Sequence, residues 1–285
     1  MKPSAQINAS PLERSWFYTL RGYGVMVLFF LVMPLVVIIP LSFNASPYFF
    51  FTHKMLTLQP SGYSTQWYIH FFTSPTWMRA IKNSFIIAPI AAAIATTLGT
   101  LAALGLTRTN IPCRGLITSI LILPMIVPLI ITAIAMFFFF SYLHLVNTYL
   151  GIIIAHSILG VPFVVIIVTA TLGGFDQRLY RAALSLGASP TRAFFKVTLP
   201  LILPGIISGA LFAFMTSFDE VVIVQFLAGP AQTTLPLQMW TNLSYTINPT
   251  ILAVATVVML IAIIMLGGLE FVRRRNLTIR QLSQN

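Results

Sequence analysis

The sequence has 285 residues, of which 58% are hydrophobic and 7% are charged, and its mean hydropathy is +0.92. Because about a quarter of the residues in soluble domains are charged, this composition excludes an ordinary soluble protein and predicts an all-α integral membrane protein. The net charge of +11 does not indicate a nucleic-acid-binding protein, because the basic residues lie between long apolar runs and do not gather on a soluble face.

Apolar runs of about 17 to 25 residues, the length that a membrane-spanning helix needs, recur along the chain. In chain order they are Gly24–Phe43, Ser84–Leu106, Leu116–Phe140, Leu150–Leu172, Leu201–Leu227 and Ile251–Phe271. The first run is longer than the apolar core of a signal peptide, and no small-residue cleavage site clearly follows it, so we expect a retained helix. The runs predict a single membrane domain with six transmembrane helices.

These runs divide the chain into a tail (1–21), a first helix (22–43), an outer segment (44–77), a core domain of five helices (78–271) and a second tail (272–285). The basic residues set the orientation, because cytoplasmic loops carry most of the Lys and Arg of membrane proteins. Of the 16 Lys and Arg residues, all but Lys54, Arg79 and Lys82 lie in the tails and in alternate loops. We therefore expect both termini in the cytoplasm.

Proline recurs inside the apolar runs, for example at Pro124 and Pro128 in the third run and at Pro204 in the fifth. A proline removes a backbone donor and kinks a helix, and neighbouring helices in a membrane can satisfy the backbone groups that it frees. We expect kinked helices here, an arrangement that suits a moving bundle but is also common in membrane helices generally.

The loop between the fourth and fifth runs, residues 173–200, is predicted to form two short helices. Four residues recur at the i, i+3, i+4 and i+7 positions of one helix face: Leu179, Ala182, Ala183 and Leu186. Gly187 can end this helix in a left-handed conformation, and Ser189 followed by Pro190 is typical of the start of another. The apolar face favours a docking surface for a second protein; the alternative is a loop that folds back against its own bundle.

The same loop resembles a known signature. Its spacing Ala182-Ala183-x3-Gly187-x9-Val197-x-Leu199-Pro200 is similar to the motif Glu-Ala-Ala-x3-Gly-x9-Ile-x-Leu-Pro in the membrane subunits of bacterial ATP-binding-cassette (ABC) importers. The resemblance implies the type I ABC importer permease fold, in which a cytoplasmic coupling helix-turn-helix docks into a cleft of a cytosolic ATPase. The coupling residues that it implies are Leu179, Arg181, Ala182, Ala183, Leu186, Gly187, Val197, Leu199 and Pro200. Arg181 stands where the family has glutamate.

Three further segments resemble the permeases of spermidine and putrescine importers: Tyr68–Ser84, Ser217–Val222 and Leu235–Leu237. Permeases for opines, aminophosphonates, ferric iron and thiamine share much of these segments. The resemblance therefore favours a small cationic solute, most of all a polyamine, and leaves those other substrates as alternatives.

The sequence contains no G-x-x-x-x-G-K-[ST] phosphate-binding loop, so we do not expect it to bind ATP by that device. The resemblance implies a non-catalytic subunit without a cofactor or metal site of its own, in the bacterial cytoplasmic (inner) membrane. The partners that it implies are a dimer of cytosolic ATP-binding subunits that bind ATP and Mg, a second homologous permease subunit, a periplasmic solute-binding protein and the lipid bilayer.

Five residues are acidic, and only Asp219 and Glu220 lie well inside an apolar run. Charges at such depth usually mark a transport pathway or a buried pair. With Phe218 beside them, they can lower the barrier for a cation through charge and cation–π attraction. The alternative is that they pair with donors on neighbouring helices, or lie at a wet outer vestibule, and stabilise the bundle. Adjacent residues point to different sides of a helix, so Asp219 is our first candidate for the pathway. His156 in the fourth run is a further candidate for the pathway or can donate to a carboxylate, although a lone histidine in a helix is more often satisfied within the packing.

Two other classes of function fit a multi-pass membrane protein. An ion-coupled secondary transporter usually shows internal repeats and ionisable residues near the midplane, and neither is clear in this sequence. A channel or scaffold protein would act without any nucleotide-binding partner. Copurification of an ATPase would separate these two classes from an importer permease.

Overall fold

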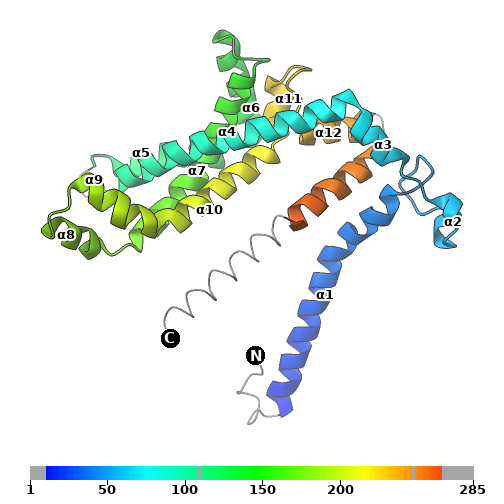
Figure 1. The fold of residues 1–285 in the computed structure, drawn as a ribbon, viewed down its shortest axis with the longest axis horizontal. Coiled ribbons are helices and arrows are strands. Elements are labelled where there is room, and N and C mark those ends of the chain that lie inside the picture. The colour runs from blue at the N-terminus through cyan, green and yellow to red at the C-terminus, as the bar shows by residue number, and fades with distance from the viewer. Residues whose placement is uncertain (1–10, 108–110, 246–247, 265–285) are drawn as a thin grey trace. The chain divides into compact units, whose positions relative to one another are not determined.

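The structure, a computed structural model, describes residues 11–107, 111–245 and 248–264. In these ranges the chain is helical and has no strand, only an isolated backbone bridge between Asn44 and Tyr63 (Figure 1). It divides into two compact units, one formed by residues 1–73 and 246–285 and the other by residues 74–245, as far as these ranges are described. The all-α class predicted from the composition is confirmed.

The first unit contains a long apolar helix and a compact segment that follows it. Its elements are α1 (Pro11–Ser42), α2 (His53–Leu56), the turn η2 (Pro60–Gly62), α3 (Gln66–Thr73) and the helix Thr250–Ile264. Asn44 is fully buried, and its amide nitrogen donates to the carbonyls of Tyr48 at 3.1 Å and Phe50 at 3.0 Å. The indole nitrogen of Trp67 donates to the Asn44 carbonyl at 2.7 Å. Asn44 therefore satisfies backbone groups that a loop would otherwise leave unpaired.

The second unit is built around α4 (Pro75–Leu106), α7 (Tyr149–Gly173) and α10 (Leu199–Phe218), which pack against one another along their lengths (Figure 1). Their shared core consists mostly of small residues: Ala92, Ala95, Ala103, Val164, Val168 and Ala213. At Gly160 the helices are so close that an added Cβ would lie 2.9 Å from the Cβ of Ala95 and 3.1 Å from that of Ala213. Small residues permit such close approach of helix backbones, which is typical of packing in membranes.

A second core joins α4 and α7 to α6 (Leu129–Tyr142) and α11 (Val222–Leu227). It is formed by larger aliphatic and aromatic side chains, among them Ile87, Phe140, Ile152, Leu159, Ile223, Val224 and Leu227. The short helix α11 is therefore anchored by its own apolar side chains, although it has only six residues.

The loop before α12 (Leu235–Tyr245) is tied to this bundle by one buried amide. The Asn83 side chain donates to the carbonyls of Ala231 at 2.9 Å and Thr233 at 2.8 Å, and its oxygen accepts from the Tyr149 hydroxyl at 2.9 Å. This loop is thereby held against α4 and α7.

Two of the predicted runs are broken helices. The third run forms α5 (Arg114–Ile126) and α6, which meet at an angle of 102°. Val127 between them is extended (φ −70°, ψ 135°), the conformation that a residue before proline prefers, and Pro128 follows. In the fifth run, α10 ends at Phe218 and α11 begins at Val222. The expected kink of the third run is thus a full break, and the fifth run is not one continuous helix.

By length and composition, four described helices can cross a membrane, and a fifth span results if the bent pair α5 and α6 counts as one. These four are α1 from Ser15, α4, α7 and the stretch Pro190–Phe218. The helix Thr250–Ile264 begins where the sixth span was predicted. The rest of that span to Phe271, the tail 272–285 and residues 1–10 of the predicted first tail lie outside the described residues.

Candidate functional site

The predicted coupling loop forms a helix-turn-helix. It contains α8 (Gln177–Ser185), α9 (Pro190–Ala193) and the π-helix η3 (Phe194–Thr198), which continues into α10. The Asp176 carboxylate caps α8 by accepting from the backbone N–H of Arg178 at 2.9 Å. The Ser189 hydroxyl caps α9 by accepting from Arg192 at 3.3 Å, with Pro190 in the first position. The predicted restart at Ser189-Pro190 is confirmed.

The end of α8 is set by Gly187, whose φ of +84° lies in the left-handed region. The Gly187 N–H donates to the carbonyl of Leu184 at 3.0 Å, and the N–H of Ala188 donates to the carbonyl of Ala183 at 3.1 Å. This is the Schellman arrangement, which satisfies the last carbonyls of a helix and favours glycine at the left-handed position. The predicted glycine stop is confirmed.

The surface of α8 carries exposed apolar side chains. Leu179 is 49% exposed and Leu186 is 88% exposed. Arg181 and Ala182 are also exposed, and Ala183 is half-buried. The remaining residues of the predicted coupling set lie on η3 and the first turn of α10, where Val197 and Leu199 are half-buried and Pro200 is exposed. The second unit alone thus leaves most of the apolar face of α8 uncovered.

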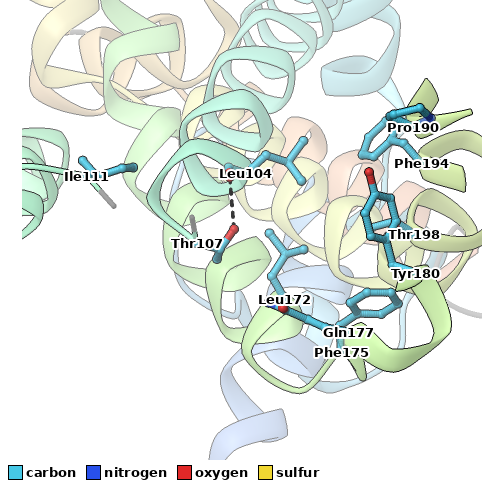
Figure 2. A pocket seen from close by; sticks show the side chains of 10 residues that line it. All are labelled: Leu104, Thr107, Ile111, Leu172, Phe175, Gln177, Tyr180, Pro190, Phe194 and Thr198. Carbon is cyan, nitrogen blue, oxygen red and sulfur yellow. Dashed lines mark hydrogen bonds between the residues drawn. The ribbon is translucent and has the colours of Figure 1, made fainter. Parts of the chain in front are cut away.

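A cavity of about 850 Å³ lies between the helices of the predicted coupling loop, α8, α9 and η3, and the ends of α4 and α7 (Figure 2). Tyr180 of α8 and Phe194 of η3 line one side of it, and Leu104 and Thr107 at the end of α4 line the other. The remaining lining residues are Ile111, Leu172, Phe175, Gln177, Pro190 and Thr198. Here the coupling helices do not pack tightly on the ends of the spans.

A second cavity, of about 740 Å³, lies where the two broken runs meet. The break between α5 and α6 contributes residues 124–129, and the break between α10 and α11 contributes Met215, Thr216 and residues 219–222. Leu159 and Phe163 of α7 complete the wall. Asp219 lines this cavity with an exposed side chain. The breaks thus place polar backbone and a carboxylate at one site in an otherwise apolar bundle.

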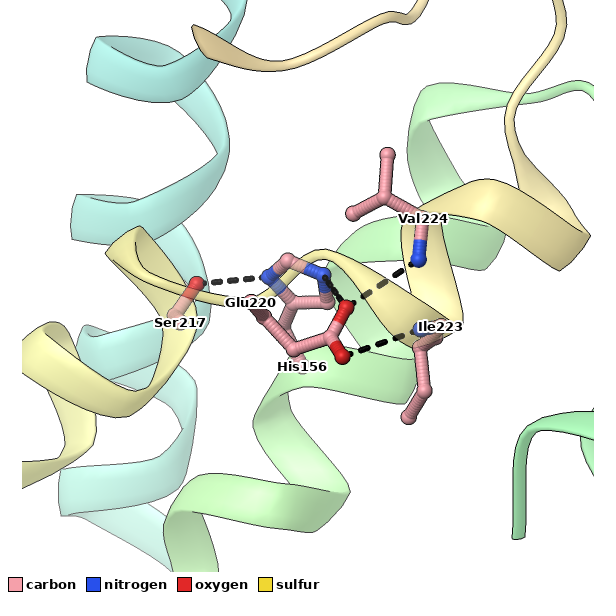
Figure 3. A network of polar contacts seen from close by, with 5 residues as sticks. All are labelled: His156, Ser217, Glu220, Ile223 and Val224. Atoms are coloured by element: carbon pink, nitrogen blue, oxygen red, sulfur yellow. Dashed lines mark hydrogen bonds and ion pairs between the residues drawn. The ribbon is translucent and has the colours of Figure 1, made fainter. Parts of the chain in front are cut away.

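Glu220, the next residue, is 5% exposed and faces the protein interior. Its two carboxylate oxygens accept from the backbone N–H groups of Ile223 at 2.9 Å and Val224 at 3.1 Å, in the first turn of α11 (Figure 3). One of these oxygens lies 3.7 Å from Nε2 of His156, whose Nδ1 is 2.7 Å from the Ser217 hydroxyl. The network joins α7, the last turn of α10 and α11.

The structure separates the residues that the sequence grouped as a pathway. Both Asp219 and Glu220 border the cavity, but Asp219 is exposed whereas Glu220 is buried and meets His156, the arrangement described by the alternative of a buried pair. Phe218 is not among the residues that line the cavity, and its ring stacks on Phe214 with the ring centroids 5.5 Å apart. Within the part of the chain that the structure describes, no cluster of three or more His, Cys, Asp or Glu residues could hold a metal ion.

Two parts of this site were not predicted. Ser217, the partner of His156, carries no signal in a single sequence, because an isolated serine in an apolar run usually bonds to its own helix. The other is the cavity wall formed by residues 124–129. Its signal in the sequence is Pro124 and Pro128, which predict a kinked helix and not a cavity wall. Two prolines four residues apart, with the second preceded by a β-branched valine, are consistent with a complete break.

Comparison with known proteins identifies the class. Residues 95–277 match the family described as binding-protein-dependent transport system inner membrane component. The chain is 29% identical over 262 residues to the spermidine/putrescine transport system permease protein PotC of Haemophilus influenzae, covering 92% of this chain and 99% of PotC. It is 35% identical over 242 residues to the putrescine transport system permease protein PotI of Escherichia coli, covering 81% of this chain and 82% of PotI.

The fold is also similar to a solved one. A crystal structure of a bacterial ABC transporter involved in the import of the acidic polysaccharide alginate matches with a TM-score of 0.70 at 15% identity, over 92% of this chain and 97% of that chain. The sequence match, the apolar helices and this similarity of fold agree with one another. The chain therefore belongs to the family of binding-protein-dependent transport system inner membrane components, the multi-pass permease subunits of ABC importers.

Proposed function

We propose that this chain forms half of the translocation pathway of an importer for a small cationic solute, most specifically a polyamine such as putrescine or spermidine. The observation that carries the proposal is the exposed carboxylate of Asp219 in the cavity where the two broken runs meet. An ionisable group at membrane depth is costly and usually serves transport, so its exposure to a cavity favours contact with solute.

The surroundings of Asp219 offer a cation a carboxylate and an aromatic ring. The last turns of α5 and α10 and the first residues of α6 and α11 all line the cavity, so the opposite partial charges of these helix ends offset one another. Two opposite unit charges 4 Å apart attract by about 4 kcal/mol in an environment of effective dielectric constant 20. Phe163, in the cavity wall, offers a ring face for a cation–π contact. The Asp219 carboxylate and the Phe163 ring therefore give an ammonium group a favourable position in this cavity.

The related proteins support the same class of substrate. PotC is described as a spermidine/putrescine permease and PotI as a putrescine permease, and both match this chain over most of its length. A polyamine is a chain of ammonium groups joined by methylenes, so a carboxylate beside aromatic and aliphatic walls suits both of its parts. Opines, aminophosphonates, ferric iron and thiamine remain substrates of related importers.

The coupling helices provide the proposed contact with a motor. We assign α8, with its exposed Leu179 and Leu186, as the surface that docks on a cytosolic ATP-binding subunit. A dimer of these subunits binds ATP and Mg, a second homologous permease completes the pathway, and a periplasmic solute-binding protein delivers the solute. A crystal structure of similar fold, with a TM-score of 0.64, is of an alginate ABC transporter in complex with its periplasmic protein. In this arrangement both termini lie in the cytoplasm of a bacterial cell.

Removing the charge of Asp219 tests the pathway directly. In the assembled transporter, Asp219→Asn keeps the size of the side chain but should lower putrescine uptake by about tenfold or more, since a charge contact at this distance contributes a few kcal/mol. Asp219→Glu, which keeps the charge, is the matched control and should retain most of the uptake. Normal uptake by Asp219→Asn would remove this residue from the pathway.

A further inference from the structure

Glu220 is adjacent to Asp219, but its environment is that of a structural group. Both of its carboxylate oxygens are occupied by backbone N–H groups of α11, and the side chain is almost fully buried. The first N–H groups of any helix lack partners within the helix, and here a single side chain satisfies two of them. Glu220 therefore fixes where α11 begins and, with it, where the break after α10 ends.

His156 connects Glu220 to two further helices, α7 and α10. It lies on α7, is fully buried, and places Nδ1 2.7 Å from the Ser217 hydroxyl in the last turn of α10. Its Nε2 lies 3.7 Å from Glu220 and has no hydrogen-bond partner within the described part of the chain. The imidazole thus spans from the end of α10 to the cap of α11 (Figure 3).

We propose that Glu220 and His156 are positioning residues that fix the break between α10 and α11 and thereby hold the Asp219 carboxylate in the cavity. This proposal rests on the proposed function only in treating Asp219 as the group that contacts solute. The positions of the two carboxylates in the break explain this role. Asp219 is the C-cap residue of α10, and the Glu220 side chain caps α11. The direction of the Asp219 side chain therefore depends on how the three residues between the helices are held.

A direct role of Glu220 in binding a cation does not fit the same contacts. To reach a solute, the carboxylate would have to leave Ile223 and Val224. Two buried N–H groups would then lack partners, which is unfavourable in a bundle without water. Asp219 can contact a solute without breaking any of these bonds, since its side chain is already exposed in the cavity.

Variants that change either the charge or the length of side chain 220 distinguish positioning of the break from direct binding of a cation. Glu220→Asp keeps the negative charge, but its side chain is shorter by one methylene, so in the present geometry neither oxygen reaches the N–H groups of Ile223 and Val224. Glu220→Gln keeps the length and one accepting oxygen but loses the charge. If Glu220 positions the break, Glu220→Asp should impair the transporter more than Glu220→Gln does. If Glu220 attracts the solute by its charge, Glu220→Gln should impair it more.

Thiol labelling measures the position of residue 219 without relying on transport. The chain has one cysteine, so Cys113→Ser gives a background in which Asp219→Cys carries the only thiol of this subunit. In the assembled transporter, Glu220→Asp should lower the rate at which a maleimide labels residue 219 by about tenfold, the size expected when buried groups lose hydrogen bonds. Thr216→Cys is the matched control, because Thr216 lines the same cavity from within α10, before the break.

The labelling at residue 216 should stay within about twofold, since α10 packs on α4 and α7 independently of the break. His156→Phe, which replaces the imidazole with an aromatic ring that has no nitrogen, should lower the labelling at residue 219 in the same direction as Glu220→Asp. Unchanged labelling at residue 219 in either variant would remove that residue from the positioning role. An equal loss at residues 216 and 219 would overturn the proposal, because the network would then support the whole cavity and not the break.

Putrescine uptake gives a second, independent reading. With Asp219 intact, Glu220→Asp should transport less than Glu220→Gln, and the opposite order would show that charge is what matters at this position. Failure of the proposed function is distinguishable, because normal uptake by Asp219→Asn would remove Asp219 from the pathway while the labelling rates still report whether Glu220 and His156 position it.

Discussion

Asp219 and Glu220 are neighbours of the same chemical type, and the structure gives them different surroundings. Asp219 follows the last residue of α10 and remains exposed in a cavity, whereas Glu220 is buried and bonded to the first turn of α11. Both residues lie in the break between α10 and α11, where the bonds of Glu220 to α11 bury its side chain and leave that of Asp219 exposed. At the scale of single residues, the local end of a helix decides the role of a carboxylate.

Close packing at single glycines makes a further prediction. Gly160→Ala should destabilise the bundle by about 1 to 3 kcal/mol, because the added methyl would press on Ala95 and Ala213, whose side chains cannot move aside. Gly105→Ala is the control, since nothing lies within 4 Å of a Cβ added there. It should be neutral or stabilising by about 0.5 to 1 kcal/mol, the helix preference of alanine over glycine.

The measurement for this pair is the midpoint of thermal unfolding of each purified variant in the same detergent. A lower midpoint for Gly160→Ala and an unchanged or higher one for Gly105→Ala are expected. Equal midpoints would show that the contact between α4, α7 and α10 near Gly160 is looser than the structure has it.

At the scale of elements, α8 is well formed by its own caps, which suits the docking role that we propose for it. It is capped at both ends, by Asp176 and by Gly187, so it is well formed before any partner binds. A preformed helix loses little conformational freedom on docking, which favours tight association and firm transmission of movement. The cavity beneath it leaves room for such movement.

Replacing one small residue on α8 tests the docking surface. Ala183→Trp should lower the amount of ATP-binding subunit that copurifies with the chain by about tenfold, since a well-packed interface position contributes more than 1 kcal/mol. Ser185→Trp is the control, because residue 185 lies about 200° around the helix from residue 183. Equal copurification by both variants would show that the partner does not contact this face.

The sequence allowed the existence of most elements to be predicted, because each has a local physical cause. Long apolar runs predicted the spans, and Gly187 and Ser189-Pro190 predicted the ends of the coupling helices. The breaks in the third and fifth runs were not predicted, because hydropathy records whether a segment suits lipid and not whether its helix is continuous. A contact of His156 with a carboxylate was one of two roles that the sequence left open, because the choice depends on how α7 packs against α10.

At the scale of the whole molecule, composition and family lead to the same conclusion. The few charges and long apolar runs of the chain indicate a protein of the lipid bilayer. Its match to the family of importer permeases favours that class over an ion-coupled transporter or a channel. The two cavities lie in one unit of the chain: one is beneath the coupling helices, and the other is where the broken runs meet. Our proposal assigns the first to the helices that dock on the ATP-binding subunit and the second to contact with the solute.

The most direct test is ATP-dependent uptake in proteoliposomes. The chain would be reconstituted with its proposed permease, ATP-binding and solute-binding partners, and labelled putrescine and spermidine would be supplied with and without ATP inside the vesicles. We predict uptake of at least one of these polyamines that requires ATP, Mg and the binding protein and that is strongly reduced by Asp219→Asn. Polyamine uptake that continues without ATP, or ATP-dependent import of a different solute only, would contradict the proposed function.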